Sequence, residues 1–486
     1  MTNLSGANLN NGAAVGPQGE GRESPSRFPK YPAYKDSGVD WLGEVPLGWR
    51  VGNLKHALVE LVSGGTPESN NSAYWSDGDG IPWVAISDMT RGSIVDSTAK
   101  SLTEAGLKSK GLRVIPAGGL LYSIYASIGK VAVLGLNAAT NQAILGLMLD
   151  SQVAEQSFIK WWLVSLEGWV KTMASSNTQD NLNAEKVRNL PLVFPSLLEQ
   201  AQVTRFLDHE TARIDALIEE QQRLIELLKE KRQAVISHAV TKGLDPTVPM
   251  KDSGVEWLGE VPEHWQIAPL KYSARVVGRI GFRGYTTDDI VDEGDGALTL
   301  SPSNMIGGSM NFDKSTYISW DKYHESPEIQ LRQGDVVLVK TGSTYGRVAF
   351  VDHLPCETTI NPQLAVFKAI KFESKFLFYL FESTYLKSLT KNSNTGGTMP
   401  TMTQENIGNY KIPMPGNAEM ELILGFIDAQ VKLIEDLVSI SENSVSLLNE
   451  RRSALISAAV TGKIDVRGWQ PPASTQAPKL EVAEAV

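Results

Sequence analysis

The residues that most often carry catalysis do not stand at catalytic spacing in this sequence. No Gly-x4-Gly-Lys-Ser/Thr phosphate loop occurs, and the stretch Asn361–Leu364 lacks the second proline and the aromatic residue of an Asn/Asp-Pro-Pro-aromatic motif. The Asp-Ser-Gly sequences at Gly38 and Gly254 differ from the Gly-x-Ser-x-Gly of a nucleophile elbow. The histidines show no pairing at metal-ligand spacing. The sequence therefore predicts no catalytic residue and no metal site.

The polar residues that remain gather in loops. Cations recur every four residues on the way into a glycine-rich loop, 278–285, at Lys271, Arg275, Arg279 and Arg283. A second loop, Ser63–Asn71, is polar and rich in asparagine, and Glu68 is its single charged residue.

The elements that position these loops are duplicated. Segment 34–46 (YKDSGVDWLGEVP) returns as 250–262 (MKDSGVEWLGEVP), 216 residues later, and Ser237–Thr241 returns as Ser457–Thr461, 220 residues later. This offset is far longer than the roughly 20–50 residues of solenoid repeats, so whole domains are repeated. The turns match between the copies while the loop residues differ, which suggests one scaffold presenting two loop sets to two different targets. Trp49 and Trp265, which follow the repeated segments, are expected to be core anchors.

Short apolar runs between glycine-rich turns, such as Ile81–Ile86 and Val336–Val339, predict β-strands. The pattern becomes helical around 158–170 and 376–385. Each globular part is therefore expected to be a mixed α/β domain.

Each copy is expected to end in a long helix. Ser196 and Glu199 form a capping box at the start of the first helix, and Gly243 ends it. Heptad-like apolar positions over ~40 residues, or ~60 Å at 1.5 Å per residue, predict a coiled coil between the two helices, with an antiparallel pair as the simplest closure. The predicted seam residues are Leu207, Ile214, Leu217, Leu224, Leu228 and Val235 in the first helix, and Ile427, Ile434, Leu437, Val445, Leu448 and Leu455 in the second. Gln221 and Ser441 share one further position of the seam, where they either fix register or form a solvated slot.

The predicted fold class is α+β: two duplicated mixed α/β domains joined by two long antiparallel coiled-coil helices, with pseudo-twofold symmetry. The expected boundaries are a disordered tail at 1–33, a globular domain at 34–195, a helix at 196–245, a second globular domain at 246–415, a second helix at 416–468 and a disordered tail at 469–486.

Composition restricts the environment and the partners. The single cysteine, Cys356, excludes an internal disulfide framework and favours a reducing cytoplasm. No apolar run reaches the ~18 residues that a membrane-spanning helix needs. The net charge is −10, and neither globular part is basic, with 13 Lys and Arg against 15 Asp and Glu over 34–195 and 16 against 19 over 250–415. Tight contact with nucleic acid would therefore need local clusters or help from partner subunits.

The pattern as a whole resembles the specificity (S) subunit of Type I restriction-modification systems. The resemblance rests on the duplicated Asp-Ser-Gly-Val segment, on Trp49 and Trp265, on the loops 64–67 and 394–400, and on the similar helix ends 231–237 and 451–457. It covers about 34–468. The first copy departs from the Gly-Gly-Thr loop pattern at 177–183.

The resemblance implies two target-recognition domains that each read one half of a bipartite, asymmetric site in double-stranded DNA, with the coiled coil as a ruler between the halves. It also implies two modification (M) subunits, which use S-adenosylmethionine to methylate adenine, and restriction (R) subunits, which use ATP and Mg²⁺. The S subunit itself would be a non-catalytic part of the methyltransferase and deoxyribonuclease complex and would hold no cofactor.

If the chain reads DNA, few side chains are needed, because arginine suits guanine and asparagine or glutamine suits adenine in the major groove. The candidate readers in the first domain are Thr66, Asn70, Asn71, Lys130, Asn141 and Gln142. Those in the second are Arg279, Arg283, Tyr285, Thr344, Arg347, Asn361 and Gln363.

An alternative is a coiled-coil scaffold whose globular domains bind proteins instead of DNA. The unequal loop sets argue against it, because a symmetric scaffold has no need of two. An unrecognised nuclease or methyltransferase is disfavoured by the missing motifs.

Overall fold

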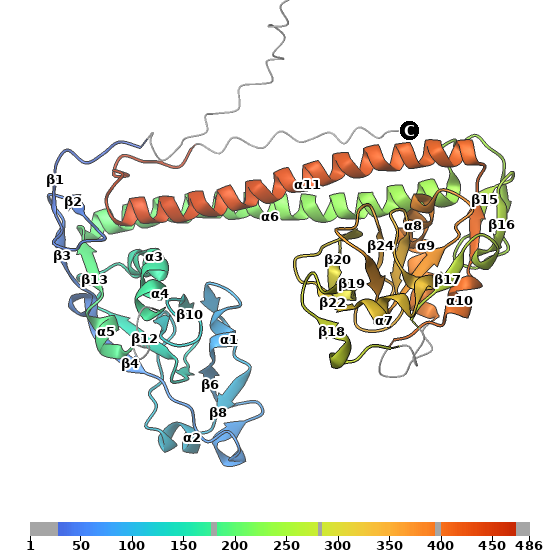
Figure 1. Cartoon of the computed structure of the whole chain (residues 1–486). Coiled ribbons are helices and arrows are strands. Elements are labelled where there is room, and N and C mark those ends of the chain that lie inside the picture. The colour runs from blue at the N-terminus through green and yellow to red at the C-terminus, as the bar shows by residue number, and fades with distance from the viewer. Residues whose placement is uncertain (1–27, 176–181, 280–283, 394–399, 473–486) are drawn as a thin grey trace, which may run out of the picture. The chain divides into compact units, whose positions relative to one another are not determined.

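The computed structural model describes residues 28–175, 182–279, 284–393 and 400–472 (Figure 1). The chain divides into two compact units: unit 1 comprises Met1–Glu219 and Val445–Val486, and unit 2 comprises Glu220–Ser444. Both divisions fall inside the long helices and not at the ends of the globular parts. The reason is that each long helix contributes apolar residues to the cores of both units.

Unit 1 is a mixed α/β structure, as predicted. Its strands are β1 (Tyr34–Asp36), β2 (Glu44–Pro46), β3 (Arg50–Asn53), β4 (Leu58–Ser63), β5 (Trp75–Ser76), β6 (Ile81–Val84), β7 (Ile94–Val95), β8 (Lys100–Leu102), β9 (Leu120–Ser123), β10 (Val131–Leu134), β11 (Ala139–Thr140), β12 (Ile144–Leu149) and β13 (Pro191–Phe194). Its shorter helices are η2 (Leu54–Ala57), η3 (Ser72–Tyr74), α1 (Ile86–Met89), α2 (Glu104–Ser109), α3 (Gln156–Ser165), α4 (Glu167–Ser175) and α5 (Ala184–Arg188). The two larger sheets have the orders β4-β12-β9-β10-β7 and β11-β6-β8-β5, and β1 pairs with β2 and β3 with β13. Pairing is antiparallel except between β10 and β7 and between β11 and β6.

Unit 2 repeats this plan. Its strands are β14 (Met250–Asp252), β15 (Glu260–Pro262), β16 (Gln266–Pro269), β17 (Arg275–Val277), β18 (Ile290–Val291), β19 (Gly296–Leu300), β20 (Met305–Ile306), β21 (Ser309–Met310), β22 (Thr316–Ser319), β23 (Val336–Val339), β24 (Val348–Phe350), β25 (Thr358–Ile360), β26 (Leu364–Lys368) and β27 (Lys411–Met414). Its shorter helices are η4 (Leu270–Tyr272), η6 (Thr287–Asp289), η7 (Pro302–Asn304), α7 (Trp320–His324), η8 (Pro327–Ile329), α8 (Ser374–Glu382), α9 (Thr384–Asn392) and α10 (Gln404–Gly408). The two larger sheets have the orders β17-β26-β23-β24 and β18-β22-β19-β25, and β19 pairs in parallel with β25 as β6 does with β11.

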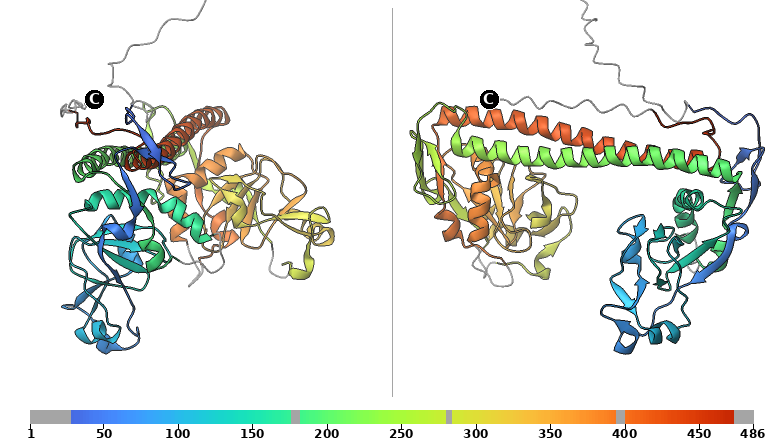
Figure 2. Two further views of the ribbon diagram at one scale, coloured as in Figure 1. Left: turned by 90° about the vertical axis from the view of Figure 1, so that its left-hand side faces the viewer. Right: turned by 180° about the vertical axis from the view of Figure 1, so that it is seen from behind.

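The long helices are α6 (Leu197–Lys242) and α11 (Asn417–Val460), and they run antiparallel within each unit (Figures 1 and 2). In unit 1, Arg452 Nε donates to Asp215 Oδ1 at 2.7 Å. In unit 2, Arg232 Nε lies 3.6 Å from Glu435 Oε1. The two ion pairs occupy equivalent positions, because Arg232 and Arg452, like Asp215 and Glu435, are 220 residues apart. The predicted antiparallel coiled coil is confirmed.

The second long helix is shorter than the expected segment 416–468, because α11 ends at Val460, close to a glycine with positive φ. Gly243 has φ 76° and follows the last turn of α6, as predicted, and Gly462 has φ 73° and follows α11. Residues 461–468, expected to be helical, therefore lie outside the helix. In the capping box, Ser196 Oγ accepts from the Glu199 N–H at 3.3 Å, but the Glu199 carboxylate accepts a hydrogen bond from Tyr31 OH at 2.7 Å instead of reaching back.

The predicted seam is buried only in part. Six of the twelve residues are buried: Leu207, Ile214, Leu228, Ile427, Ile434 and Leu455. Three are half-buried: Val235, Val445 and Leu448. The assignment was wrong for Leu217, Leu224 and Leu437, whose exposed fractions are 40%, 40% and 41%. A single partner helix covers only a narrow stripe, and these three lie toward the middle of the helices, away from the globular cores. Ser441, in contrast, is buried.

The repeated opening segment forms the same turn twice. Asp36 Oδ1 accepts from the Gly38 N–H at 2.9 Å, and Asp252 Oδ1 accepts from the Gly254 N–H at 3.0 Å. Both glycines have positive φ, which a side chain would strain. Trp49 and Trp265 follow these turns and are almost completely buried, which confirms them as core anchors.

The prediction of disordered tails needs correction where the structure describes them. Phe28 and Trp469 each pack edge-to-face against Phe206, with ring centres 5.2 Å apart, and Tyr31 belongs to the unit 1 core. The segments on either side of the helices thus join one core, which local composition could not indicate. Residues 1–27 and 473–486 lie outside the described residues.

Among the described residues, no helix is both long and apolar enough to cross a membrane. In each unit, α3 or α8 lies between the long helices and the sheets (Figures 1 and 2). Trp161 of α3 donates from Nε1 to Asp208 at 2.8 Å, and Tyr379 of α8 donates to Asp428 at 2.6 Å. These bonds fix each globular part to its own stretch of helix.

Candidate nucleic-acid interface

Three of the predicted readers of unit 1 come together beside the loop 64–67. A methyl group at Gly64 would lie 2.0 Å from the carbonyl oxygen of Asn141, so only glycine allows this approach. Thr66 Oγ1 donates to Gln142 Oε1. Asn141 Oδ1 accepts from the Ala143 N–H at 3.0 Å and so shapes its own turn, whereas the Gln142 side chain is exposed.

Asn70, another predicted reader of unit 1, lies at a separate hollow. This hollow has a volume of about 610 Å³ and is lined by Asn70, Trp75 and Lys100, among others. The Lys100 ammonium lies 5.1 Å from the centre of the Trp75 ring. Asn71 caps η3 by accepting from the Ala73 N–H at 3.1 Å, which is a structural use of its side chain.

Lys130 is neutralised within unit 1. Its ammonium lies 3.0 Å from Glu167 Oε1, and Lys171 lies 2.6 Å from the same oxygen. Burial raises the pKa of the Glu167 carboxyl, but hydrogen bonds from Lys171 and Lys130 outweigh it and hold that pKa below its usual value. The carboxylate therefore stays charged and competes with any phosphate for Lys130.

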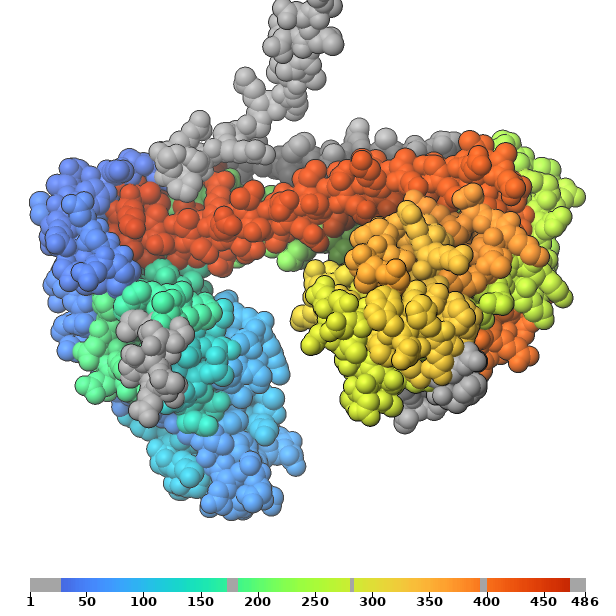
Figure 3. Space-filling model, viewed as in Figure 1, coloured from blue at the N-terminus to red at the C-terminus, as the bar shows by residue number. Residues whose placement is uncertain are grey.

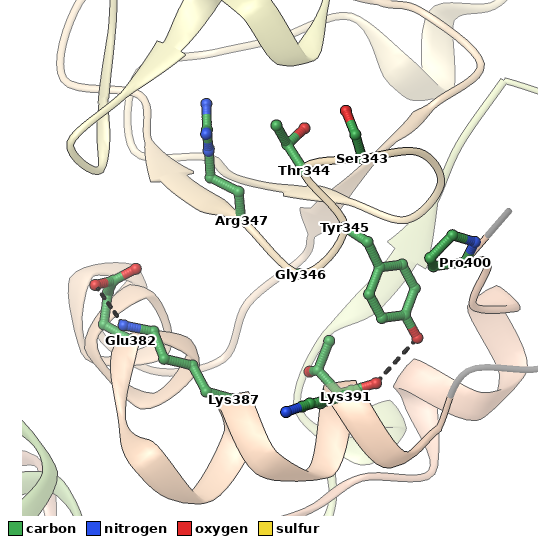
Figure 4. Close-up of a pocket in the computed structure, with 10 residues that line it drawn as sticks. Ser343, Thr344, Tyr345, Gly346, Arg347, Glu382, Lys387, Lys391 and Pro400 are labelled. Carbon is green, nitrogen blue, oxygen red and sulfur yellow. Dashed lines mark hydrogen bonds and ion pairs between the residues drawn. The ribbon is translucent and has the colours of Figure 1, made fainter. Parts of the chain in front are cut away.

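In unit 2, the loop 341–347 lines a cationic hollow of about 600 Å³ (Figure 4). Thr344 and Arg347 were predicted, and Lys387 and Lys391 of α9 join them. Their four-residue spacing, which would place both lysines on one face of a helix, was a signal that could have found them. Glu382 is the single acid of the lining, and it pairs with Lys387 at 3.1 Å.

The loop is held by its own aromatic residue. Figure 4 shows Tyr345 pointing toward α9, where its hydroxyl donates to the Thr390 carbonyl at 3.0 Å. Burial raises the pKa of Tyr345 to about 12. Arg347 points the other way in the same view and donates to the Met305 carbonyl at 2.7 Å. The cations of the hollow are thus presented on a fixed loop and a helix.

Arg279 lies inside unit 2, which differs from the expectation that it faces a ligand. Its exposed fraction is 3%, and its guanidinium donates to the Ile360 carbonyl at 3.1 Å and to Thr359 Oγ1 at 3.2 Å. The Tyr285 ring lies 5.6 Å away, and burial lowers the pKa of the guanidinium. Arg279 and Tyr285 therefore contact each other within the described part of unit 2. Arg283 lies outside the described residues.

Hydrogen bonds fix the register between the copies at the last pair of readers. Asn361 Oδ1 accepts from the Gln363 N–H at 3.0 Å, just as Asn141 accepts from Ala143. Gln363 therefore occupies the position of Ala143, and not that of Gln142. Asn361 is buried, whereas the Gln363 side chain is exposed.

The arrangement is suited to recognition. It offers exposed amides and hydroxyls on fixed turns, with cations beside them, which matches a hydrogen-bonding anionic polymer. Within the described ranges, no group of three or more His, Cys, Asp or Glu side chains could hold a metal ion.

Known proteins are similar to this chain over most of its length. A family model described as "Type I restriction modification DNA specificity domain" matches residues 46–228 and 310–441. Two similar proteins from Methanocaldococcus jannaschii are the Type I restriction enzyme specificity subunits MjaVIII and MjaIX. MjaVIII is 22% identical over 69% of this chain and 76% of its own length. MjaIX is 21% identical over 87% of this chain and 95% of its own length.

Solved structures show the same fold. A chain from a study of complex assembly and conformational transition of the type I R-M system aligns with a TM-score of 0.62 at 18% identity, covering 86% of this chain and 98% of that one. The HsdS subunit from Thermoanaerobacter tengcongensis aligns with a TM-score of 0.51 at 15% identity, over 86% of this chain and 98% of its own.

Proposed function

The chain belongs to the Type I restriction-modification DNA specificity family, and from this premise we propose that each of its units reads one half of a bipartite, asymmetric site in double-stranded DNA. The observation that supports this proposal is that the two units share one framework but have different loop residues. The glycine-assisted turn at Asn141 and the turn at Asn361 have the same hydrogen bonds, yet their neighbours differ in size, polarity and charge. Two unlike half-sites are the targets that such a pair fits. The alternative of a protein-binding scaffold has no support in the family match.

The charge of the chain supports a model in which partner subunits share in binding the DNA. A net charge of −10 opposes unaided binding, because phosphate neutralisation supplies most of the affinity for DNA. In the cationic hollow, Lys391 gives unit 2 a local contact for phosphate, whereas Lys387 is paired with Glu382. Partner subunits would supply the rest of the positive surface.

Exposed apolar residues support the proposal that modification subunits bind the long helices. In unit 2, the outer face of α11 exposes large apolar residues at helical spacing: Leu422, Phe426, Leu433, Leu437 and Ile440. In unit 1, Leu447 of the same helix is also exposed. Figure 3 shows α11 at the surface of each unit. An uncovered apolar stripe on a helix is typical of a helix-binding partner.

In this proposal, the chain directs chemistry that its partners perform in the cytoplasm. Two modification subunits use S-adenosylmethionine to methylate adenine at the recognised site, and restriction subunits use ATP and Mg²⁺ to cleave DNA. This chain contributes no catalytic group.

The test is co-expression with the neighbouring genes, followed by methylation-aware sequencing of host DNA. The expected result is a methylated-adenine motif of two short halves with a fixed gap, which disappears when this gene is deleted. Unchanged methylation, together with stable association with proteins other than a methyltransferase, would contradict the proposal.

A further inference from the structure

Three positions around one turn of unit 2 are polar where the same positions of unit 1 are apolar. The first is Lys340. Its N–H donates to the Gln363 carbonyl at 2.9 Å, as the Ile124 N–H donates to the Ala143 carbonyl at 2.8 Å. Lys340 therefore replaces Ile124, which is almost completely buried in the core of unit 1.

The second and third positions are Gln363 and Gln404. Gln363 replaces Ala143, as the matched asparagine turns establish. Gln404 is the first residue of α10, and Ala184 is the first residue of α5; each follows a cap, at Thr403 and Asn183, whose side chain accepts a backbone N–H. Unit 1 thus has Ile, Ala and Ala where unit 2 has Lys, Gln and Gln.

These polar side chains gather where glycines leave room for them. A methyl group at Gly278 would lie 3.0 Å from Gln404 Nε2 and 3.5 Å from Lys340 Cε, so both side chains lie against the open face of this glycine. Gln363 Nε2 would lie 3.3 Å from a methyl group at Gly342. One ammonium and two amides are therefore grouped at the start of the loop 341–347.

The Lys340 ammonium has no hydrogen-bond or ion-pair partner among the residues that the structure describes. The side chain is half-buried, and burial alone lowers the pKa of the ammonium. A cation taken partly out of water without a partner is unfavourable. Its N–H donors are therefore available to a ligand, and groups with shifted pKa values cluster at functional sites.

We propose, building on the proposed function, that Lys340, Gln363 and Gln404 form a base-reading site that exists in unit 2 alone. Lysine donates to O6 and N7 of guanine, and the glutamine amide pairs with N6 and N7 of adenine, so the site fits a purine-containing half-site. The cationic hollow is lined by the same loop, and its Lys391 would contact a phosphate, which fixes position but carries no sequence information.

The test compares variants of the full complex in cells by methylation-aware sequencing. Lys340→Ile and Gln404→Ala introduce the residues of unit 1 at matched positions. Lys371→Ile is the control, because it removes an exposed lysine at the opposite end of β26. Lys340→Ile is expected to lower discrimination at one base of one half-site by about tenfold, and Gln404→Ala to do so at a second base, while the other half-site and the gap stay unchanged.

Each outcome separates this inference from the proposed function. A wild-type complex that methylates no bipartite motif would contradict the proposed function itself. A wild-type motif that both variants retain in full would overturn only the base-reading site. If Lys340→Ile abolishes methylation at every DNA sequence, Lys340 is needed for folding. Gln404→Ala, which leaves the strand intact, would then decide the question. Full discrimination between bases by the Gln404→Ala complex would overturn the base-reading site.

Discussion

The two units bury the same tryptophan in different hydrogen-bonding surroundings. In unit 2, Trp265 Nε1 donates to Glu419 at 3.0 Å, and His264 Nε2 lies 2.8 Å from the same carboxylate oxygen. In unit 1, Glu199 stands at the position of Glu419 but accepts from Tyr31, and Trp49 Nε1 has no partner among the described residues. Unit 2 is built from one continuous stretch of chain, whereas unit 1 must join both ends of the chain. The duplicated framework therefore accommodates a different chain connectivity by a change in the hydrogen-bond donor to one carboxylate, Glu199 in unit 1 and Glu419 in unit 2.

Other contacts are the same in both units. Asp208 and Asp428 each accept from an aromatic side chain of the helix above the sheets, and Asp215 and Glu435 each pair with an arginine of the facing helix. The comparison shows that duplication kept what holds each unit to the helices, while the loops diverged.

The largest expected effect comes from changing the helix pair that both units share. Seven residues of helix-forming sequence inserted after Gln222 and also after Ser444 keep the heptad phase and add about 10 Å. The gap in the methylated motif should grow by about three base pairs, since successive pairs lie ~3.4 Å apart. Methylation-aware sequencing reads the gap directly. The same insertion in α6 alone should abolish methylation, and an unchanged gap with both insertions would refute the ruler.

Next in size is the glycine after each long helix. Gly462 and Gly243 both have positive φ, but a methyl group at Gly462 would lie 2.5 Å from the Pro46 ring, whereas the nearest atoms to one at Gly243 lie 3.4 Å away. Gly462→Ala should destabilise unit 1 by about 3 kcal/mol, and Gly243→Ala should destabilise unit 2 by about 1 kcal/mol. Hydrogen exchange of peptides from each unit measures the two separately. Equal costs would show that the Pro46 contact relaxes.

The tryptophan comparison predicts a smaller difference. Trp265→Phe and Trp49→Phe remove similar volume from similar cores, but only Trp265→Phe removes a hydrogen bond. Trp265→Phe should therefore cost about 1 kcal/mol more. Chemical denaturation of the full chain, with hydrogen exchange to assign the unit, tests this. A larger loss for Trp49→Phe would mean that its indole N–H is satisfied in solution.

The arginine pairs between the helices should have the smallest effects. Arg452 makes two hydrogen bonds to Asp215, at 2.7 and 3.3 Å, whereas Arg232 lies 3.6 Å from Glu435. Exposed pairs contribute about 0–1 kcal/mol, so Arg452→Met should cost up to about 1 kcal/mol and Arg232→Met less. A thermal unfolding series at low and high salt checks the order, because salt should reduce the difference. A reversed order would indicate that the neighbouring Glu382 is the main partner of Arg232.

The sequence by itself determined the duplication, the mixed α/β units, and the long helices with their capping serine and terminal Gly243. These depend on repeats and local periodicity, which neighbouring residues express directly. Periodicity also predicted the seam where the helices meet a globular core, but it failed at Leu217, Leu224 and Leu437. The burial of these three leucines depends on what covers the outer face of the helix pair, which the periodicity of the sequence does not indicate.

Only the tertiary structure decided which polar residues face outward. Arg279 looks like a reader in the sequence but donates to carbonyls across the unit, whereas Lys340 was overlooked because a one-residue change in loop length hides its match to Ile124. The same holds for Tyr31 and Trp469, whose places in one core follow from contacts with residues more than 160 positions away along the chain. Such contacts are set by the packing of distant segments, and no local pattern of residues encodes them.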